Sequence, residues 1–184
     1  TLWGDTSRFK AAYLSAFPGY YFSGDGGYQD EEGYVFITGR MDDIINVAGH
    51  RLSTAEMEEV LAAHPAVAEC AVTGVADELK GQIPVGFVIL KSGTAIAEAQ
   101  IEADLVKMVR ETIGPVASFK RVVVAKRLPK SLSVKILRKI IRAIADVKDF
   151  DPPSTIEDLG VLGELENLMQ EQGIGKFGAA GGGF

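Results

Sequence analysis

The chain has 184 residues, of which 47% are hydrophobic and 24% are charged, a composition typical of globular proteins and not of disordered ones. Acidic residues (25) outnumber basic ones (19), and the net charge of −6 argues against a nucleic-acid-binding protein. No apolar run approaches the roughly 18 residues of a membrane helix and no signal-peptide pattern opens the chain, so the sequence predicts a cytoplasmic protein without a membrane partner, with the matrix of an organelle left open.

Residues 1–41 are rich in aromatic residues and glycines, which cluster around Pro18 and Gly19. The run Asp30–Gly33 predicts a hairpin turn before a strand at Tyr34–Ile37. This segment is too short and irregular to bury a core of its own. We therefore interpret it as the end of a larger domain.

From Asp43 onward the pattern becomes regular. Apolar runs predict strands at residues 44–47, 67–75, 85–90 and 122–124. Helical spacing predicts three helices, beginning near Ser53, Ile101 and Lys135. The order β-α-β-β-α-β-α predicts an α+β domain in which a small mixed sheet is covered by helices.

This region also contains a capping motif, a basic helix face and the single cysteine of the chain. Ser53 and Glu56 have the spacing of a capping box at the first of these helices. The last helix is expected to point Arg138 outward. The single cysteine, Cys70, stands in an apolar strand pattern and is expected to be a buried structural thiol.

Beyond Asp146 the composition changes. Residues 151–154 are expected to form a linker and residues 156–169 an amphipathic helix. Six of the last twelve residues are glycine, so the terminus is expected to be disordered.

Three ordered segments carry a family resemblance: Tyr21–Asp25, Ile37–Asp43 and Asn46–Arg51. Together they resemble the AMP-forming short-chain acyl-CoA synthetases, the acetyl- and propionyl-CoA synthetases of the adenylate-forming superfamily. The likeness extends from about Trp3 to about Ala145, and the ending after Asp151 is similar to that of propionyl-CoA synthetases.

The resemblance implies three parts: residues 1–41 as the end of a large N-terminal adenylating domain, 42–148 as a mobile C-terminal domain, and 149–184 as a linker, short helix and glycine-rich tail. It implies an acid–thiol ligase that uses a short-chain carboxylate, ATP with Mg²⁺, and CoA, and forms an acyl-adenylate. No Ser/Thr/Gly-rich ATP loop is found, so the chain is expected to be inactive without the missing N-terminal domain.

Lys135 resembles the lysine that bridges the acyl carboxylate and the phosphate during adenylation, where a fixed cation lowers the barrier. The family resemblance also implies a lysine acetyltransferase as a partner acting on Lys135. The loop departs from the family pattern, because Ser131 replaces a threonine, Leu132 an arginine and Val134 a glycine. A valine resists a left-handed backbone, so adenylation by this loop stands as an open question, and an exposed surface lysine is the alternative interpretation.

The other site residues are also implied by the resemblance. Asp25 and Arg40 resemble the residues that bind the ribose of the nucleotide, and Arg51 resembles one that reaches its phosphate; a turn aspartate is the alternative for Asp25. Asp42 matches the hinge about which the C-terminal domain rotates. CoA-binding roles are implied for Ala48, Gly49 and Arg110, with a surface role as the alternative for Arg110.

Relatives bind a cation near the position of His64, which implies a metal site formed with Ala62 and Val67. A single imidazole is a weak basis for such a site, and a histidine that ends a helix is the alternative. Two other functions remain open at this stage: a non-catalytic CoA- or nucleotide-binding or regulatory module derived from this family, and a luciferase-like or peptide-synthetase adenylation fragment.

Overall fold

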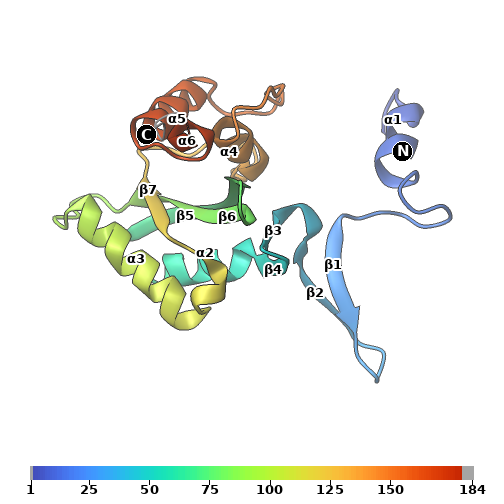
Figure 1. The fold of residues 1–184 in the computed structure, drawn as a ribbon. Helices are drawn as coiled ribbons and strands as arrows, with labels where there is room; N and C mark the ends of the chain where they lie inside the picture. The colour runs from blue at the N-terminus through green and yellow to red at the C-terminus, as the bar shows by residue number, and fades with distance from the viewer. Residues whose placement is uncertain (1, 180–184) are drawn as a thin grey trace. The chain divides into compact units, whose positions relative to one another are not determined.

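The computed structural model describes residues 2–179, which divide into two compact units between Asp42 and Asp43 (Figure 1). A short 3-10 helix, Met41–Asp43, stands at the division. Among the helices in the described part of the chain, none is both long and apolar enough to cross a bilayer.

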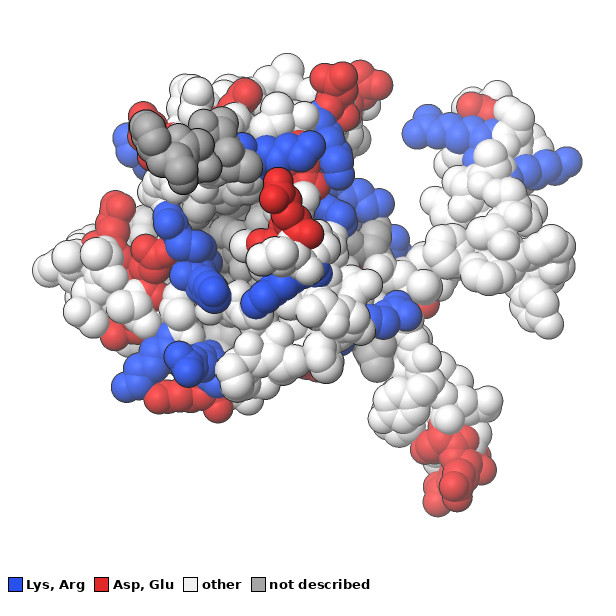
Figure 2. All heavy atoms as spheres, in the orientation of Figure 1, with Lys and Arg blue, Asp and Glu red and all other residues white. Residues whose placement is uncertain are grey.

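The first unit consists of one helix and one hairpin. Helix α1 (Thr6–Tyr13) begins after Asp5, whose carboxylate accepts the Arg8 N–H at 2.9 Å. Strands β1 (Asp25–Gln29) and β2 (Val35–Arg40) pair antiparallel, which confirms the predicted hairpin turn. Figure 2 shows the acidic side chains of this turn gathered at the tip of the hairpin.

No described hydrophobic side chain of residues 2–41 is buried. Large apolar side chains are exposed instead, including Trp3, Tyr20, Tyr34, Val35 and Ile37. An apolar surface of this kind is unusual for an isolated unit.

The second unit contains most of the regular structure. Its strands are β3 (Ile44–Val47), β4 (His50–Ser53), β5 (Val67–Asp77), β6 (Gly81–Leu90) and β7 (Arg121–Val124). Its helices are α2 (Thr54–Ala62), α3 (Glu98–Thr112), α4 (Arg138–Ala145), α5 (Gly160–Glu171) and α6 (Lys176–Ala179), with a 3-10 turn at Pro115–Ala117.

The sheet is mixed and open. Its order is β4-β3-β6-β5, all antiparallel, and β7 runs parallel to β6. The predicted α+β class is confirmed. Strand β4 was missed because His50–Ser53 is only four residues long and mostly polar.

Helices cover both faces of this sheet (Figure 1). Successive residues of β5 point to opposite faces because side chains alternate along a strand. Val72 packs in a core with Leu61 of α2 and Leu105 of α3. Ala71 packs in a second core with Ile141 of α4 and Leu165 of α5. The α5 helix is therefore part of the second core.

Carboxylates cap outer amides of two of the edge strands, β5 and β7. Glu58 of α2 accepts the Val72 N–H at 2.8 Å and buried Asp146 accepts the Ala76 N–H at 2.8 Å, both on β5. Glu102 of α3 accepts the Val122 N–H of β7 at 3.2 Å. The helices thus satisfy donors that an edge strand otherwise leaves open.

Two helix predictions need correction. Ser53 is the N-cap residue of α2, but its side chain makes no capping hydrogen bond, because the residue is held in β4 opposite Ile44. The last predicted helix begins at Arg138 and not at Lys135. Arg138 does not simply point to solvent, since its guanidinium binds Glu58 at 2.6 and 2.7 Å.

The C-terminal region is more ordered than its composition suggests. Helix α5 begins at Gly160, four residues later than predicted, and Ile174 is buried in the second core. The α6 helix follows within the segment expected to be disordered. The remainder of that prediction falls on residues 180–184, which lie outside the described residues.

Candidate functional site

Lys135 lies in a tight hairpin-like loop between β7 and α4. The Ser131 N–H donates to the Lys135 carbonyl at 2.9 Å, and the Val134 N–H donates to the Ser131 carbonyl at 2.8 Å. Lys130 and Ile136 form an antiparallel bridge below this turn. The loop is therefore held by backbone bonds and places Lys135 two residues before Leu137, the N-cap of α4.

Val134 adopts a left-handed backbone with φ of +62°. A turn followed by one left-handed residue is a common three-residue hairpin loop, and glycine is favoured at the left-handed position. The family resemblance places a glycine there. The loop thus has the glycine conformation although it carries a valine.

The Lys135 side chain is exposed, and within residues 2–179 its ammonium has no hydrogen bond or ion pair. Lys130 differs, because its ammonium lies 2.5 Å from Glu69 Oε2 and its side chain is only 19% exposed. Of the two loop lysines, Lys135 is the one available to a bound anion.

Ala48 and Gly49 form the turn between β3 and β4. Both have positive φ, +48° and +88°, as a type I′ turn requires. Nothing in the second unit lies within 4 Å of the position that a Cβ on Gly49 would take. A ligand chain can therefore approach the backbone here.

Asp25 and Arg40 face each other across the β1–β2 hairpin. Their side chains form an ion pair of 3.3 Å, and Arg40 Nη1 also donates to the Ser23 carbonyl at 2.8 Å. Gly24 makes this possible, since a Cβ there would lie 2.9 Å from Arg40 Nη2. The structure brings together the two residues implied to bind ribose.

The remaining assigned residues lie at separate places on the second unit. Arg51 is exposed on β4, and Arg110 is exposed in the last turn of α3. Neither position distinguishes a ligand-binding arginine from a surface one.

His64 is buried just after α2, and its Nδ1 accepts the Ala66 N–H at 3.2 Å. Its carbonyl accepts the Val67 N–H at 3.0 Å. Only Nε2 remains for a ligand. In residues 2–179 no group of three His, Cys, Asp or Glu side chains could hold a metal ion.

The sequence did not indicate a polar cluster at Glu58. Its carboxylate accepts from the Val72 amide and binds Arg138 in a bidentate fork, so it joins α2, β5 and α4. The pKa of Arg138 is raised chiefly by Glu58, with a smaller contribution from Asp43 beside the unit boundary. Cys70 donates to the Glu58 carbonyl, and burial together with the Glu58 charge raises the pKa of this thiol to about 11. Cys70 is partly buried, and not fully buried as predicted; its bond to the Glu58 carbonyl and its raised pKa fit a structural thiol.

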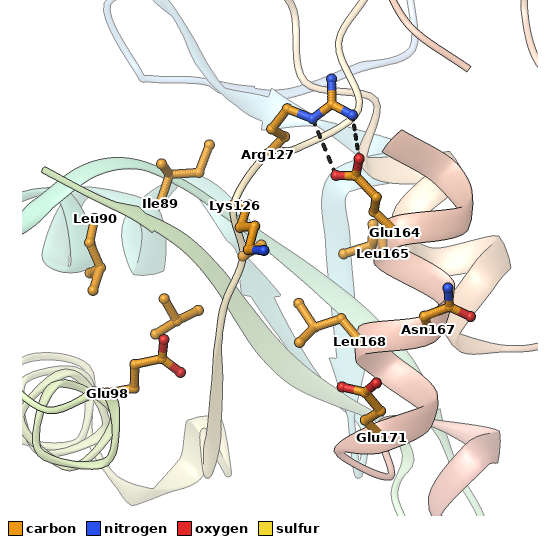
Figure 3. A pocket seen from close by; sticks show the side chains of 12 residues that line it. Ile89, Leu90, Glu98, Lys126, Arg127, Glu164, Leu165, Asn167, Leu168 and Glu171 are labelled. Atoms are coloured by element: carbon orange, nitrogen blue, oxygen red, sulfur yellow. Dashed lines mark hydrogen bonds and ion pairs between the residues drawn. The ribbon is translucent and has the colours of Figure 1, made fainter. Parts of the chain in front are cut away.

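A surface cavity of about 870 Å³ lies between the ends of β6 and β7 and helix α5 (Figure 3). Ile89, Leu90 and Leu168 provide apolar walls, and Arg127 faces Glu164 at its rim. None of the residues assigned by resemblance lines it. Over the visible face of the second unit, Lys and Arg side chains are interspersed with Asp and Glu (Figure 2).

The chain that carries these sites is similar to known proteins. Residues 56–135 match the AMP-binding enzyme C-terminal domain. An uncharacterized protein of Pseudomonas aeruginosa is 58% identical over 95% of this chain and 28% of its own length. The mitochondrial acyl-CoA synthetase short-chain family member B of Dictyostelium discoideum is 51% identical over 90% of this chain and 24% of its own length.

A solved structure extends the comparison. The anthranilate CoA ligase in complex with anthranoyl-AMP aligns with a TM-score of 0.57 and 34% identity, over 66% of this chain and 23% of that one. The chain spans about a quarter of the length of the curated relatives it matches.

Proposed function

We propose that the chain, which carries the AMP-binding enzyme C-terminal domain and is similar to short-chain acyl-CoA synthetases, is the C-terminal part of an acid–thiol ligase. The proposed enzyme converts acetate or propionate, ATP and CoA into the acyl-CoA, AMP and pyrophosphate. This chain would be inactive alone, because the residues that bind the acyl group are proposed to lie in a larger N-terminal domain.

The geometry of the Lys135 loop carries this proposal. Val134 takes the left-handed conformation that a glycine takes easily, and Lys135 follows it with an exposed, unpaired ammonium. A residue is held in an unfavourable backbone conformation where the surrounding structure requires it, and such sites are often functional. The backbone at this position therefore keeps a conformation that a glycine favours, although the residue is a valine.

In the first half-reaction a carboxylate oxygen of the acid attacks the α-phosphorus of ATP and pyrophosphate leaves. Both reactants are anions, so the Lys135 ammonium would stabilise the charge that gathers between them. In the second, the CoA sulfur attacks the acyl carbon, loses its proton, and AMP leaves. The Ala48–Gly49 turn would let the thiol arm of CoA pass close to the backbone, and Arg110 would meet its phosphates.

Asp25 and Arg40 supply the proposed nucleotide contacts of the first unit. The carboxylate can accept from both ribose hydroxyls, and the Arg40 ion pair keeps it oriented. Arg51 would bind the phosphate. Mg²⁺ bound with ATP takes most of its ligands from phosphates and water, which suits a chain whose described residues offer no metal cluster.

The division of the chain between Asp42 and Asp43 supports Asp42 as the hinge. The exposed apolar surface of residues 2–41 supports the N-terminal domain as the partner that covers it. The exposed Lys135 is also open to a lysine acetyltransferase, and acetylation would remove its charge.

The test replaces Lys135 by alanine in the full-length protein that contains this chain. Acetate- or propionate-dependent pyrophosphate exchange should fall at least about a hundredfold, equivalent to about 2.7 kcal/mol of transition-state stabilisation. Thioester formation from supplied acyl-adenylate should change little. Lys126→Ala, at another exposed lysine, is the control. Equal loss of both half-reactions would refute the assigned role.

The strained Val134 also favours a second candidate, a non-catalytic module that still binds CoA or nucleotide. Calorimetry of the 184-residue chain with CoA and with ATP, together with the exchange assay, separates the two. Binding of CoA without any pyrophosphate exchange in the full-length protein would favour the module.

A further inference from the structure

The Lys135 loop is paired along its outer side by a distant segment of the chain. The Leu132 N–H donates to the Thr155 carbonyl at 2.7 Å, and the Glu157 N–H donates to the Lys130 carbonyl at 2.9 Å. Ser131 and Ile156 form an antiparallel bridge between these two bonds. Residues 155–157 thus add a short strand to the loop, although they lie outside the matched family domain, which ends at Lys135.

An arginine fork anchors the added strand. Arg127, three residues before Lys130, donates to Glu164 at 2.5 and 3.2 Å (Figure 3). It also donates to Asp158 at 2.5 Å. Asp158 directly follows the added strand, and its other oxygen accepts the Gly160 N–H at 2.7 Å. One guanidinium therefore connects the start of the lysine loop with both the added strand and α5.

The carboxylates of this fork are ionised at neutral pH. The pKa of Asp158 is lowered chiefly by the Gly160 N–H and then by Arg127. The pKa of Glu164 is lowered chiefly by its hydrogen bonds from Arg127. A planar guanidinium makes three donors available in fixed directions, which a lysine ammonium cannot reproduce.

The fork is poorly placed to act as a general stabiliser of the domain. Arg127 is 47% exposed, and Asp158 and Glu164 are 49% and 52% exposed. Ion pairs this exposed contribute little to global stability because solvent screens them. The loop itself, however, contains a valine in a conformation it disfavours, and such a conformation persists only when neighbouring structure restrains it.

We propose that residues Thr155–Asp158 and Arg127 are the positioning element of the Lys135 loop. The added strand and its arginine anchor hold residues 130–132, which precede Val134 and pair in turn with Lys135 and Ile136, so that Lys135 projects from a fixed point. This inference rests on the proposed role of Lys135 in adenylation. It adds that part of the structure holding the Lys135 loop in place lies outside residues 56–135, the matched domain.

The first test needs no catalysis. In the 184-residue chain, Arg127→Met removes the fork while it keeps a flexible, unbranched apolar side chain. Amide hydrogen exchange at Leu132 and Glu157 should accelerate at least about tenfold, with circular dichroism unchanged. Arg121→Met is the matched control, because Arg121 is 44% exposed and makes a surface ion pair of 3.1 Å with Glu102. It should leave exchange at Leu132 unchanged.

The second test uses the full-length protein. Arg127→Met should lower carboxylate-dependent pyrophosphate exchange about tenfold and spare thioester formation from supplied acyl-adenylate. Arg127→Lys keeps the charge without the fork and should give an intermediate loss; it also serves if Arg127→Met does not fold. A purely structural role would lower both half-reactions together.

The outcomes separate this inference from the proposed function. Unchanged exchange at Leu132 in both Arg127 variants overturns the positioning element, whatever Lys135 does. Faster exchange at Leu132 with undiminished adenylation also overturns it, provided that Lys135→Ala is inactive. If Lys135→Ala keeps full adenylation, the proposed function fails, and with it the catalytic purpose of the element.

Discussion

Replacing Val134 by glycine should stabilise the chain, which is the reverse of the usual effect of glycine. A left-handed backbone costs a residue with a Cβ roughly 1–2 kcal/mol, and φ at Val134 is +62°. The side chain is 70% exposed, so little packing is lost. Glycine adds about 0.5–1 kcal/mol of conformational entropy to the unfolded chain. The net change is a gain of up to about 1.5 kcal/mol in the free energy of unfolding.

Leu132 offers a matched control in the same loop. Its side chain is also 70% exposed, but its φ is not positive. Leu132→Gly should therefore lower the free energy of unfolding by about 0.5–1 kcal/mol, since no strain is relieved. Urea denaturation of both variants, followed by circular dichroism, gives the two values.

The difference between the stability changes of Val134→Gly and Leu132→Gly tests whether the left-handed backbone at Val134 is strained. If Val134→Gly and Leu132→Gly lose stability by the same amount, the left-handed conformation carries no strain and our reasoning about this loop is wrong. A gain for Val134→Gly alone shows that the protein tolerates a strained residue beside Lys135.

Two further predictions concern buried groups. Asp146→Ala should lower the free energy of unfolding by about 3–5 kcal/mol, because it leaves the Ala76 N–H and the Lys148 ammonium without their carboxylate. Asp146→Asn keeps an acceptor and should lower it by about 1–3 kcal/mol. Equal losses in urea denaturation would show that the hydrogen bond from the Ala76 N–H contributes nothing to stability. The pKa of Cys70 is about 11, against an ordinary 9.0. At pH 8 the fraction of thiolate falls tenfold for each unit by which the pKa rises, so Cys70 should react with a thiol reagent about a hundredfold more slowly than an exposed cysteine. A rate equal to that of glutathione would contradict the burial of this thiol.

The sequence was sufficient for the elements that have clear periodicity. Apolar spacing predicted α2, α3 and the long strands β5 and β6, and turn residues predicted the β1–β2 hairpin. The pattern misled at Lys135, where Ile136 and Ile140 continue a helical spacing but the left-handed Val134 and the bridge at Ile136 delay the helix to Arg138. The sign of a backbone φ angle and a bridge between a single pair of residues leave no periodic pattern in the sequence.

The same limit applies to the candidate site. Motifs in the sequence identified Lys135 and the pair Asp25 and Arg40, and the structure brings the last two into contact. The partners of the lysine loop were missed, because residues 155–158 follow two prolines and were interpreted as part of a linker and a helix. Arg127 and Glu164 are 37 residues apart, and nothing in either local pattern indicates that they meet.

The capped edges of the second unit limit how it can touch other proteins. A foreign strand that approached β5 or β7 would have to displace Glu58, Asp146 or Glu102, and would bring its own carbonyls against a carboxylate. Pairing of a foreign strand through backbone hydrogen bonds, which form cooperatively and separate slowly, is therefore disfavoured at these amides. At these two edges, contacts with a neighbouring domain are then left to side chains, which separate one at a time. In the proposed enzyme, a C-terminal domain that moves between the two half-reactions would separate from its neighbour more easily with edges of this kind.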